Sequence, residues 1–139
     1  MCVALKWDDW PASAEDYDLY LFRPGGAVAA VSASPQTGTG PPTEQLCQIN
    51  GSTTPETYGI AIRANHVSGR PVRFDLFTYP GPNFEYQVPA GSVTEPGTSP
   101  AALTVGAVCW QDNRLEPYSS LGPTIDGRTK PDLVGPDSV

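Results

Sequence analysis

Turn-forming residues interrupt this chain so often that long helices have no room, and this spacing is the strongest constraint on its fold. Sixteen prolines and 14 glycines are spread over 139 residues, where they separate short apolar runs and form no repeats. No stretch of ten or more residues combines a helical apolar period with good helix formers. Short strands joined by turns, as in an all-β domain, are therefore predicted.

An alternating pattern of side chains marks the predicted strands. In residues 17–22 (YDLYLF), Leu19 and Leu21 share one face of a strand, and Tyr20 and Phe22 share the other. Comparable patterns predict six strands, at residues 3–7, 17–22, 27–31, 44–49, 57–63 and 72–79. A seventh strand is predicted at residues 84–88. Strands of this number and spacing predict a mainly β fold, an antiparallel β-sandwich that is jelly-roll-like or immunoglobulin-like.

Two turns and one loop organise these strands. Pro24-Gly25-Gly26 predicts a hairpin turn, and Asn50-Gly51 is a strong turn dipeptide that closes the fourth strand. Asn50-Gly51-Ser52 is also formally a glycosylation sequon, but a hairpin turn explains the dipeptide without a sugar. Residues 32–43 (SASPQTGTGPPT) have almost nothing to bury, so a long mobile loop is predicted there.

The pattern changes near residue 91. Residues 100–108 (PAALTVGAV) are continuously apolar, which is typical of a strand buried on both faces in a parallel sheet. The chain should therefore contain a sandwich domain in residues 1–90 and an extended C-terminal segment in residues 91–139, cut from a longer protein. Beyond Trp110 little can be buried, so poor order is expected unless a second chain holds this segment. A homodimer or higher association through the segment follows.

Charge and cysteine content exclude several classes of function. Fifteen acidic and eight basic residues give a net charge of −7, so neither a basic stripe nor nucleic-acid binding is expected. No run of 18 apolar residues predicts a membrane span, and the first residues lack the features of a signal peptide. Cys2, Cys47 and Cys109 fit no metal spacing, and their odd number leaves at least one unpaired. At least two are expected to be small buried hydrophobic residues.

Acidic residues gather near the first two predicted strands. Asp8, Asp9, Asp16 and Asp18, with Glu15 beside them, could supply oxygen ligands to calcium at one end of a sandwich. A solvated acidic edge that discourages aggregation is the alternative. No other cofactor is predicted.

The C-terminal segment carries a series of short motifs in a fixed order. After SPAALTVGAV (residues 99–108) come Tyr118-Ser119-Ser120, Gly122-Pro123, Asp126-Gly127-Arg128 and Lys130-Pro131-Asp132-Leu133. This order resembles the core of subtilisin-like serine peptidases (subtilases). In that family a VGAV-like strand leads to an SS-x-GP turn, and a strand ending in an APxV-like segment then runs towards the catalytic serine. Gly135 stands where the family more often has Ala.

The N-terminal pattern LKWDD…DYDLYLFRPGG…TYGIAIRA…VRFDLFTY, in residues 3–80, resembles a second family. It is similar to the accessory β-sandwich domains of secreted bacterial peptidases, of the pre-peptidase C-terminal kind. In some subtilases such a domain is inserted between the oxyanion asparagine and the VGAV strand. The resemblance implies an extracellular location and, as partner, the rest of a peptidase catalytic domain acting on protein or peptide substrates. The inserted domain would serve substrate positioning, access or stability.

No catalytic residue is predicted in this chain. Subtilisin-type catalysis needs Asp, His and Ser in chain order, with an oxyanion donor. His66 lies in a polar turn and is expected at the surface. Ser119 and Ser120 lie in a turn without the G-T-S-x-A-x-P sequence, and no A-G-N context is present. The chain alone is therefore not expected to be an enzyme, whereas its parent would be a subtilisin-like serine endopeptidase.

Two other functions remain open at this stage. A carbohydrate- or surface-binding sandwich could use Trp7, Trp10, Tyr17 and Tyr20 as exposed aromatic platforms, although alternating aromatics more often pack in a core. A purely structural module is the third candidate. The motifs of residues 119–136 (SSLGPTIDGRTKPDLVGP) favour the peptidase hypothesis, because a carbohydrate module has no need of them.

Overall fold

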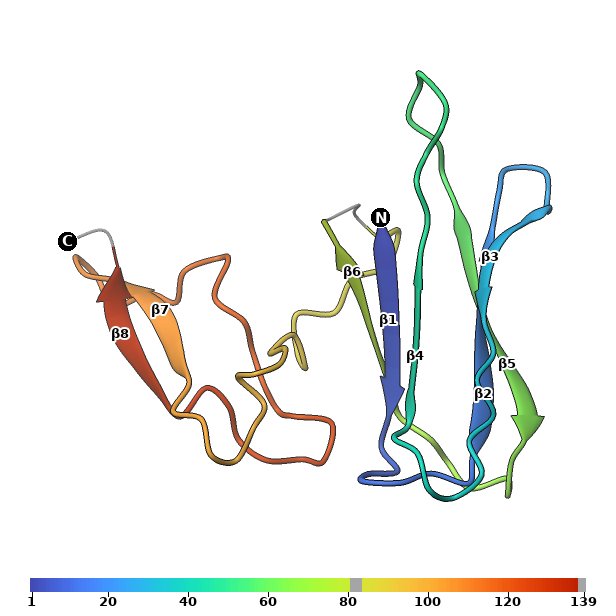
Figure 1. Cartoon of the computed structure of the whole chain (residues 1–139). Coiled ribbons are helices and arrows are strands. Elements are labelled where there is room, and N and C mark those ends of the chain that lie inside the picture. Colours follow the sequence, from blue (N-terminus) through green and yellow to red (C-terminus); the bar gives the residue numbers. More distant parts are fainter. Residues whose placement is uncertain (81–83, 138–139) are drawn as a thin grey trace. The chain divides into compact units, whose positions relative to one another are not determined.

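The computed structural model describes residues 1–80 and 84–137, and every regular element in them is a strand (Figure 1). The prediction of a mainly β fold is confirmed. The chain divides into two compact units, Met1–Asn83 and Phe84–Val139. The predicted boundary lies at residues 90 and 91. Within the described ranges, no helix is long and apolar enough to cross a lipid bilayer.

Two antiparallel sheets of three strands each form the N-terminal unit. One sheet has the order β4-β1-β6 and the other the order β3-β2-β5 (Figure 1). The strands are β1 (Cys2–Trp7), β2 (Asp16–Phe22), β3 (Val28–Ser32), β4 (Thr43–Cys47), β5 (Gly59–His66) and β6 (Phe74–Tyr79). These six strands match the six predicted ones to within a few residues. β2 and β3 form the predicted hairpin across Pro24-Gly25-Gly26.

The two sheets share one hydrophobic core. The inward side chains of the central strands β1 and β2 are almost completely buried, with contributions from β4 and partial cover from β3, β5 and β6. Tyr17 connects the sheets, because the centroid of its ring lies 5.4 Å from that of Trp7 and 4.9 Å from that of Phe74, both in T-shaped arrangements. Leu19 and Leu21 are fully buried, whereas Tyr20 and Phe22 are only partly buried, as the alternation predicts.

The loop between β3 and β4 is packed more closely than expected. Gln36 is 7% exposed and Pro42 is fully buried, so the expectation that this segment has almost nothing to bury is wrong. Glu44 of β4, only 3% exposed, accepts hydrogen bonds from the Ser34 amide and the Gln36 side chain, both at 2.9 Å. The Gln36 side chain also accepts the Tyr17 amide at 3.3 Å. A buried carboxylate needs such partners, and this one ties the loop to β4.

Cys2 and Cys47 form a disulfide, whereas Cys109 is free. The two bonded residues are opposite each other in the register of β1 and β4, although 45 positions separate them in the sequence. Cys47 is exposed and Cys2 only partly buried. The prediction that at least two cysteines are buried hydrophobic residues is therefore wrong for this pair.

Two further predictions differ from the structure. Asn50-Gly51 is not a hairpin turn, because β4 and the following strand β5 belong to different sheets and are joined by an exposed loop. Residues 84–88 form no strand. In both places the local sequence pattern was present, but no strand pairs there as the pattern requires.

The C-terminal unit contains a two-stranded parallel sheet. β7 (Val105–Cys109) pairs with β8 (Leu133–Asp137), so that Val105 lies opposite Leu133 and Gly106 opposite Val134. The strand predicted in the apolar run at residues 100–108 is thus shorter than expected, and β8 lies where poor order was predicted. Lys130 holds this part together, since its buried ammonium donates to the Ala102 carbonyl at 2.7 Å and lies 2.6 Å from the Asp132 carboxylate.

Truncating Leu19 should destabilise the N-terminal unit strongly. The side chain is fully buried in the shared core, so Leu19→Ala should lower the free energy of unfolding by about 2–5 kcal/mol. Urea denaturation followed by tryptophan fluorescence measures the change. Ile49→Ala is the matched control, because Ile49 is 84% exposed. Equal effects of the two substitutions would contradict the assigned core.

Candidate functional site

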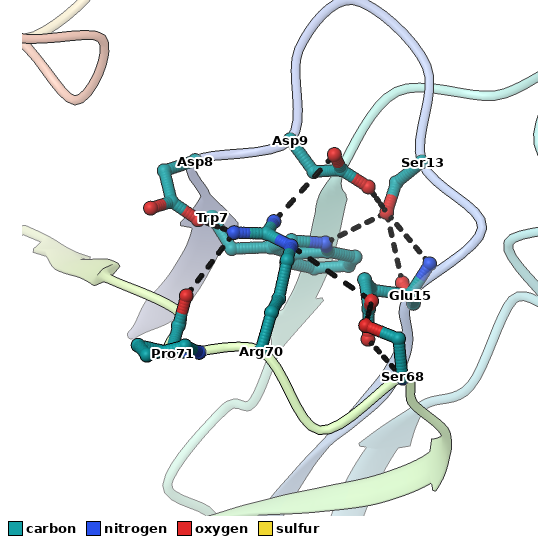
Figure 2. A network of polar contacts seen from close by, with 8 residues as sticks. All are labelled: Trp7, Asp8, Asp9, Ser13, Glu15, Ser68, Arg70 and Pro71. Carbon is teal, nitrogen blue, oxygen red and sulfur yellow. Dashed lines mark hydrogen bonds and ion pairs between the residues drawn. The ribbon is translucent and has the colours of Figure 1, made fainter.

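A group of charged residues surrounds Arg70 in the N-terminal unit, as Figure 2 shows. Its guanidinium lies between the loop that follows β1 and the segment that joins β5 to β6. Three carboxylates face it, Asp8 at 3.1 Å, Asp9 at 3.5 Å and Glu15 at 3.8 Å. Nη1 also donates to the Pro71 carbonyl at 3.2 Å. Arg70 therefore fastens two segments that are far apart in sequence.

Ser13 connects this group to the core (Figure 2). The buried indole Nε1 of Trp7 donates to the Ser13 hydroxyl at 3.0 Å, as does the Glu15 amide, also at 3.0 Å. The same hydroxyl oxygen lies 2.7 Å from the Asp9 carboxylate, to which it donates. Because the Trp7 side chain is completely buried, Ser13 supplies the hydrogen-bond partner that its N–H would otherwise lack.

Glu15 is the most buried carboxylate of the group, at 7% exposure. It accepts the Ser68 hydroxyl and, at 2.9 Å, the Ser68 amide. These two hydrogen bonds, with the nearby Arg70 charge, hold the pKa of Glu15 below its ordinary value. The network thus favours an ionised Glu15. It also joins the loop after β1 to the segment between β5 and β6. Arg70 Nη2 is buried without a hydrogen-bond partner among the described residues, and it lies 3.5 Å from the Asp9 carboxylate as an ion pair.

The structure does not gather the four predicted calcium ligands. Asp8 and Asp9 face Arg70, Asp16 accepts the Gln36 amide at 3.2 Å, and Asp18 lies 3.3 Å from the Tyr20 hydroxyl. In residues 1–80 and 84–137, no group of three or more His, Cys, Asp or Glu side chains is placed to hold a metal ion. The calcium site stays a prediction.

Sequence reasoning missed Arg70, the residue that organises this group. Its nearest carboxylate, Asp8, lies 62 positions earlier in the chain. No local motif announces such a contact, because the two segments meet only when β1 and β6 pair in one sheet. The sequence offered one signal, an arginine between two predicted strands of an acidic chain. That signal does not predict which carboxylate the arginine binds.

An open hollow of about 430 Å³ is the second candidate, in the C-terminal unit. Residues 93–97, 104–107 and 118–120, together with Pro131, line it. Ser119 lies at its wall, where the hydroxyl oxygen accepts the Ala107 amide at 3.0 Å. None of its lining residues is a histidine that could activate this hydroxyl. His66, the only histidine of the chain, is an exposed residue at the end of β5 in the other unit.

A tight turn at residues 124–128 of the C-terminal unit is held by charge. Asp126 accepts the Arg128 guanidinium at 2.7 Å and also the Thr124 hydroxyl, and these bonds lower its pKa to about 2. Arg128 reaches further, to the Thr98 carbonyl at 2.8 Å. The D-G-R sequence therefore fixes a turn in this structure, in which Asp126 and Arg128 bind each other.

The aromatic residues do not form a shared platform. Trp7 is fully buried and Tyr17 is 8% exposed, so the expectation that they lie at the surface is wrong. Trp10 is 46% exposed on the loop after β1. Tyr20 lies on the outer face of β2, where its ring stacks with that of Phe22 at 6.1 Å. Two of the four aromatics are therefore unavailable to a ligand.

Comparison with models of protein families, with curated proteins and with solved structures finds no match. The family resemblances of residues 3–80 and 99–136 therefore stay predictions. What the chain does must be inferred from its own residues and geometry.

Replacing Glu15 with Gln should make stability depend less on pH. A carboxylate whose pKa is lowered on folding contributes stability above its unfolded pKa, near 4.5, and this contribution is lost as the pH falls through the lower folded value. Glu15→Gln should therefore lower the melting temperature at neutral pH and flatten its decline below roughly pH 5. Thermal melts by circular dichroism measure both effects. Glu85→Gln, at an exposed site, is the control, and identical pH profiles for the two variants would contradict the assignment.

Calcium should leave the melting curve unchanged. The carboxylates of Asp8 and Asp9 already face Arg70, so a cation would have to displace a guanidinium to bind there. Melting temperatures in millimolar CaCl₂ and in EDTA measure the effect by mass action. A rise with calcium that Asp16→Asn removes would restore the predicted metal site.

Proposed function

We propose that this chain is a non-catalytic part of a secreted subtilisin-like serine endopeptidase. The N-terminal unit would be an accessory β-sandwich domain of jelly-roll-like topology, and the C-terminal unit a strip of the peptidase core. The accessory domain would position substrate, restrict access to the cleft or add stability. Its partners would be the rest of the catalytic domain and, through it, a protein or peptide substrate.

The parallel pairing of β7 and β8 is the observation that carries this proposal. These strands hold the VGAV and LVGP sequences, and parallel strands belong to sheets that helices cover on both faces. Val105 and Leu133 are opposite each other and are 54% and 45% exposed. Val134, the neighbour of Leu133, points to the other face and is 54% exposed. Both faces thus present apolar side chains, as expected of a strip from a larger α/β core.

The N-terminal unit supports the other half of the proposal. Two antiparallel sheets with one shared core are what a sandwich domain requires. The Cys2–Cys47 disulfide supports an extracellular location, because disulfides persist in oxidising compartments. The carbohydrate-binding alternative loses support, since Trp7 and Tyr17 lie in the core.

The isolated chain should not hydrolyse proteins. Its sequence lacks the G-T-S-x-A-x-P serine motif and the A-G-N context of the oxyanion asparagine, and catalysis needs nucleophile, base and oxyanion donor assembled together. The gene from which it comes should encode Asp and His motifs before this chain and G-T-S-x-A-x-P after it. Casein hydrolysis by the full gene product, blocked by a serine-directed phosphonate, measures the parent activity. Phosphonate-sensitive hydrolysis by the isolated chain, or a gene without these motifs, would refute the proposal.

The exposed faces of β7 and β8 should make the isolated chain self-associate. Burying a Val or Leu side chain contributes roughly 1.5–3 kcal/mol, and Val105, Leu133 and Val134 are all open. Light scattering should find a dimer or larger species, and Val105→Lys should shift it towards the monomer. Val28→Lys, at an equally exposed site of the N-terminal unit, should not. A monomer at all concentrations would show that the C-terminal unit needs no cover.

A further inference from the structure

Two dipeptides of this chain place glycine directly after Asn or Asp, the composition that most favours reaction of a side-chain carbonyl with the following main-chain amide. They are Asn50-Gly51 and Asp126-Gly127. Glycine favours this reaction because it has no side chain to obstruct closure of a five-membered ring. Local geometry decides whether the ring can form, and the two sites differ in it.

Asn50 lies exposed in the loop that joins β4 to β5. Its side-chain carbonyl accepts the Ser52 amide at 2.8 Å, and its side-chain nitrogen donates to the Thr54 carbonyl at 2.8 Å. The first bond makes an Asx turn, in which the side chain folds back along the next two residues. The hydrogen bond from the Ser52 amide polarises the Asn50 side-chain carbonyl.

The Gly51 amide is free to react. It donates no hydrogen bond to any residue in the two described ranges. A Cβ at Gly51 would meet no atom within 4 Å, so no neighbouring group crowds the Gly51 α-carbon. Electrophile and nucleophile are therefore adjacent, exposed and unobstructed at this position.

Asp126-Gly127 is closed to the same reaction. The Gly127 amide donates to the Thr124 carbonyl at 2.9 Å, and the Asp126 carboxylate is held by Arg128 at 2.7 Å. A carboxylate that stays ionised is also a poor electrophile. Asn113, an exposed asparagine, is blocked too, because the Arg114 amide donates to the Asp112 side chain at 3.1 Å.

We infer that Asn50 is a site of spontaneous deamidation and isoaspartate formation, and that the fold protects Asp126 and Asn113 from the same chemistry. The Gly51 nitrogen loses its proton and bonds to Cγ of Asn50. The bond from Cγ to the side-chain nitrogen breaks, and ammonia leaves with that proton. Water then opens the cyclic imide at either carbonyl, which yields Asp or isoaspartate. One water is consumed and one ammonia released, with no oxidant or cofactor.

The modification would alter the loop between the two sheets. It adds a negative charge to an already acidic chain, and the isoaspartate product inserts a methylene into the main chain. It depends on no property of the proposed peptidase, so each proposal can fail without the other. Neither the Arg70 group nor the hollow of the C-terminal unit contains Asn50.

Peptide mapping by mass spectrometry after incubation of the folded full chain tests the inference. The peptide that contains Asn50 should exchange ammonia for water, and isoaspartyl methyltransferase should label it. The rate should rise with pH, because the Gly51 amide reacts after losing its proton. In the folded chain, the peptides that contain Asn113 and Asp126 should form isoaspartate more slowly than the same peptides of the chain unfolded in urea.

Gly51→Ala is the matched variant, and it should abolish most of the modification at Asn50 while leaving the melting temperature unchanged. Three results would overturn the inference. They are an Asn50 peptide that stays as intact as the Asn113 peptide, a Gly51→Ala chain that reacts as fast as the original, and equal reactivity of Asp126 in folded and unfolded chains.

Discussion

Burial of alternating side chains from β1 and β2 in one core is the interaction on which the N-terminal unit depends. These strands are the central members of the two sheets, so each brings its two neighbours to the same core. Trp7 is the largest of the fully buried side chains and contacts Tyr17 of the opposite sheet. The core also determines where polar groups lie. The completely buried indole N–H of Trp7 needs a hydrogen-bond acceptor, and the Ser13 hydroxyl is that acceptor.

Two buried glutamates extend this core into the loops. Glu15 binds the segment between β5 and β6 through Ser68 and Arg70, and Glu44 binds the loop between β3 and β4 through Gln36. A carboxylate out of water is tolerated only when charged or hydrogen-bonding groups replace its solvent. Each therefore selects one conformation of a loop that has few apolar side chains of its own. The charged group around Arg70 is explained by this structural role.

The C-terminal unit is organised differently. Its parallel strands are joined by hydrogen-bonded turns around Asp126 and Lys130, and apolar side chains on both faces of β7 and β8 remain exposed. Such a unit gains little from a core of its own, because a two-stranded sheet is marginal without cover. The turns of this unit are ordered, but the apolar faces of its strands are uncovered. This combination favours a role as part of a larger assembly.

By itself, the sequence determined the strands of the N-terminal unit and the faces that they bury. Alternation in β1 and β2 is a local property, set by the two-residue period of a strand, and Leu19 and Leu21 follow it. Only the tertiary structure decided that Asn50-Gly51 joins two sheets, that Cys2 meets Cys47, and that Arg70 meets Asp8. These outcomes depend on which strands become neighbours. Strand pairing is chosen by the whole core, because residues far apart in the chain meet only when their apolar faces are buried together.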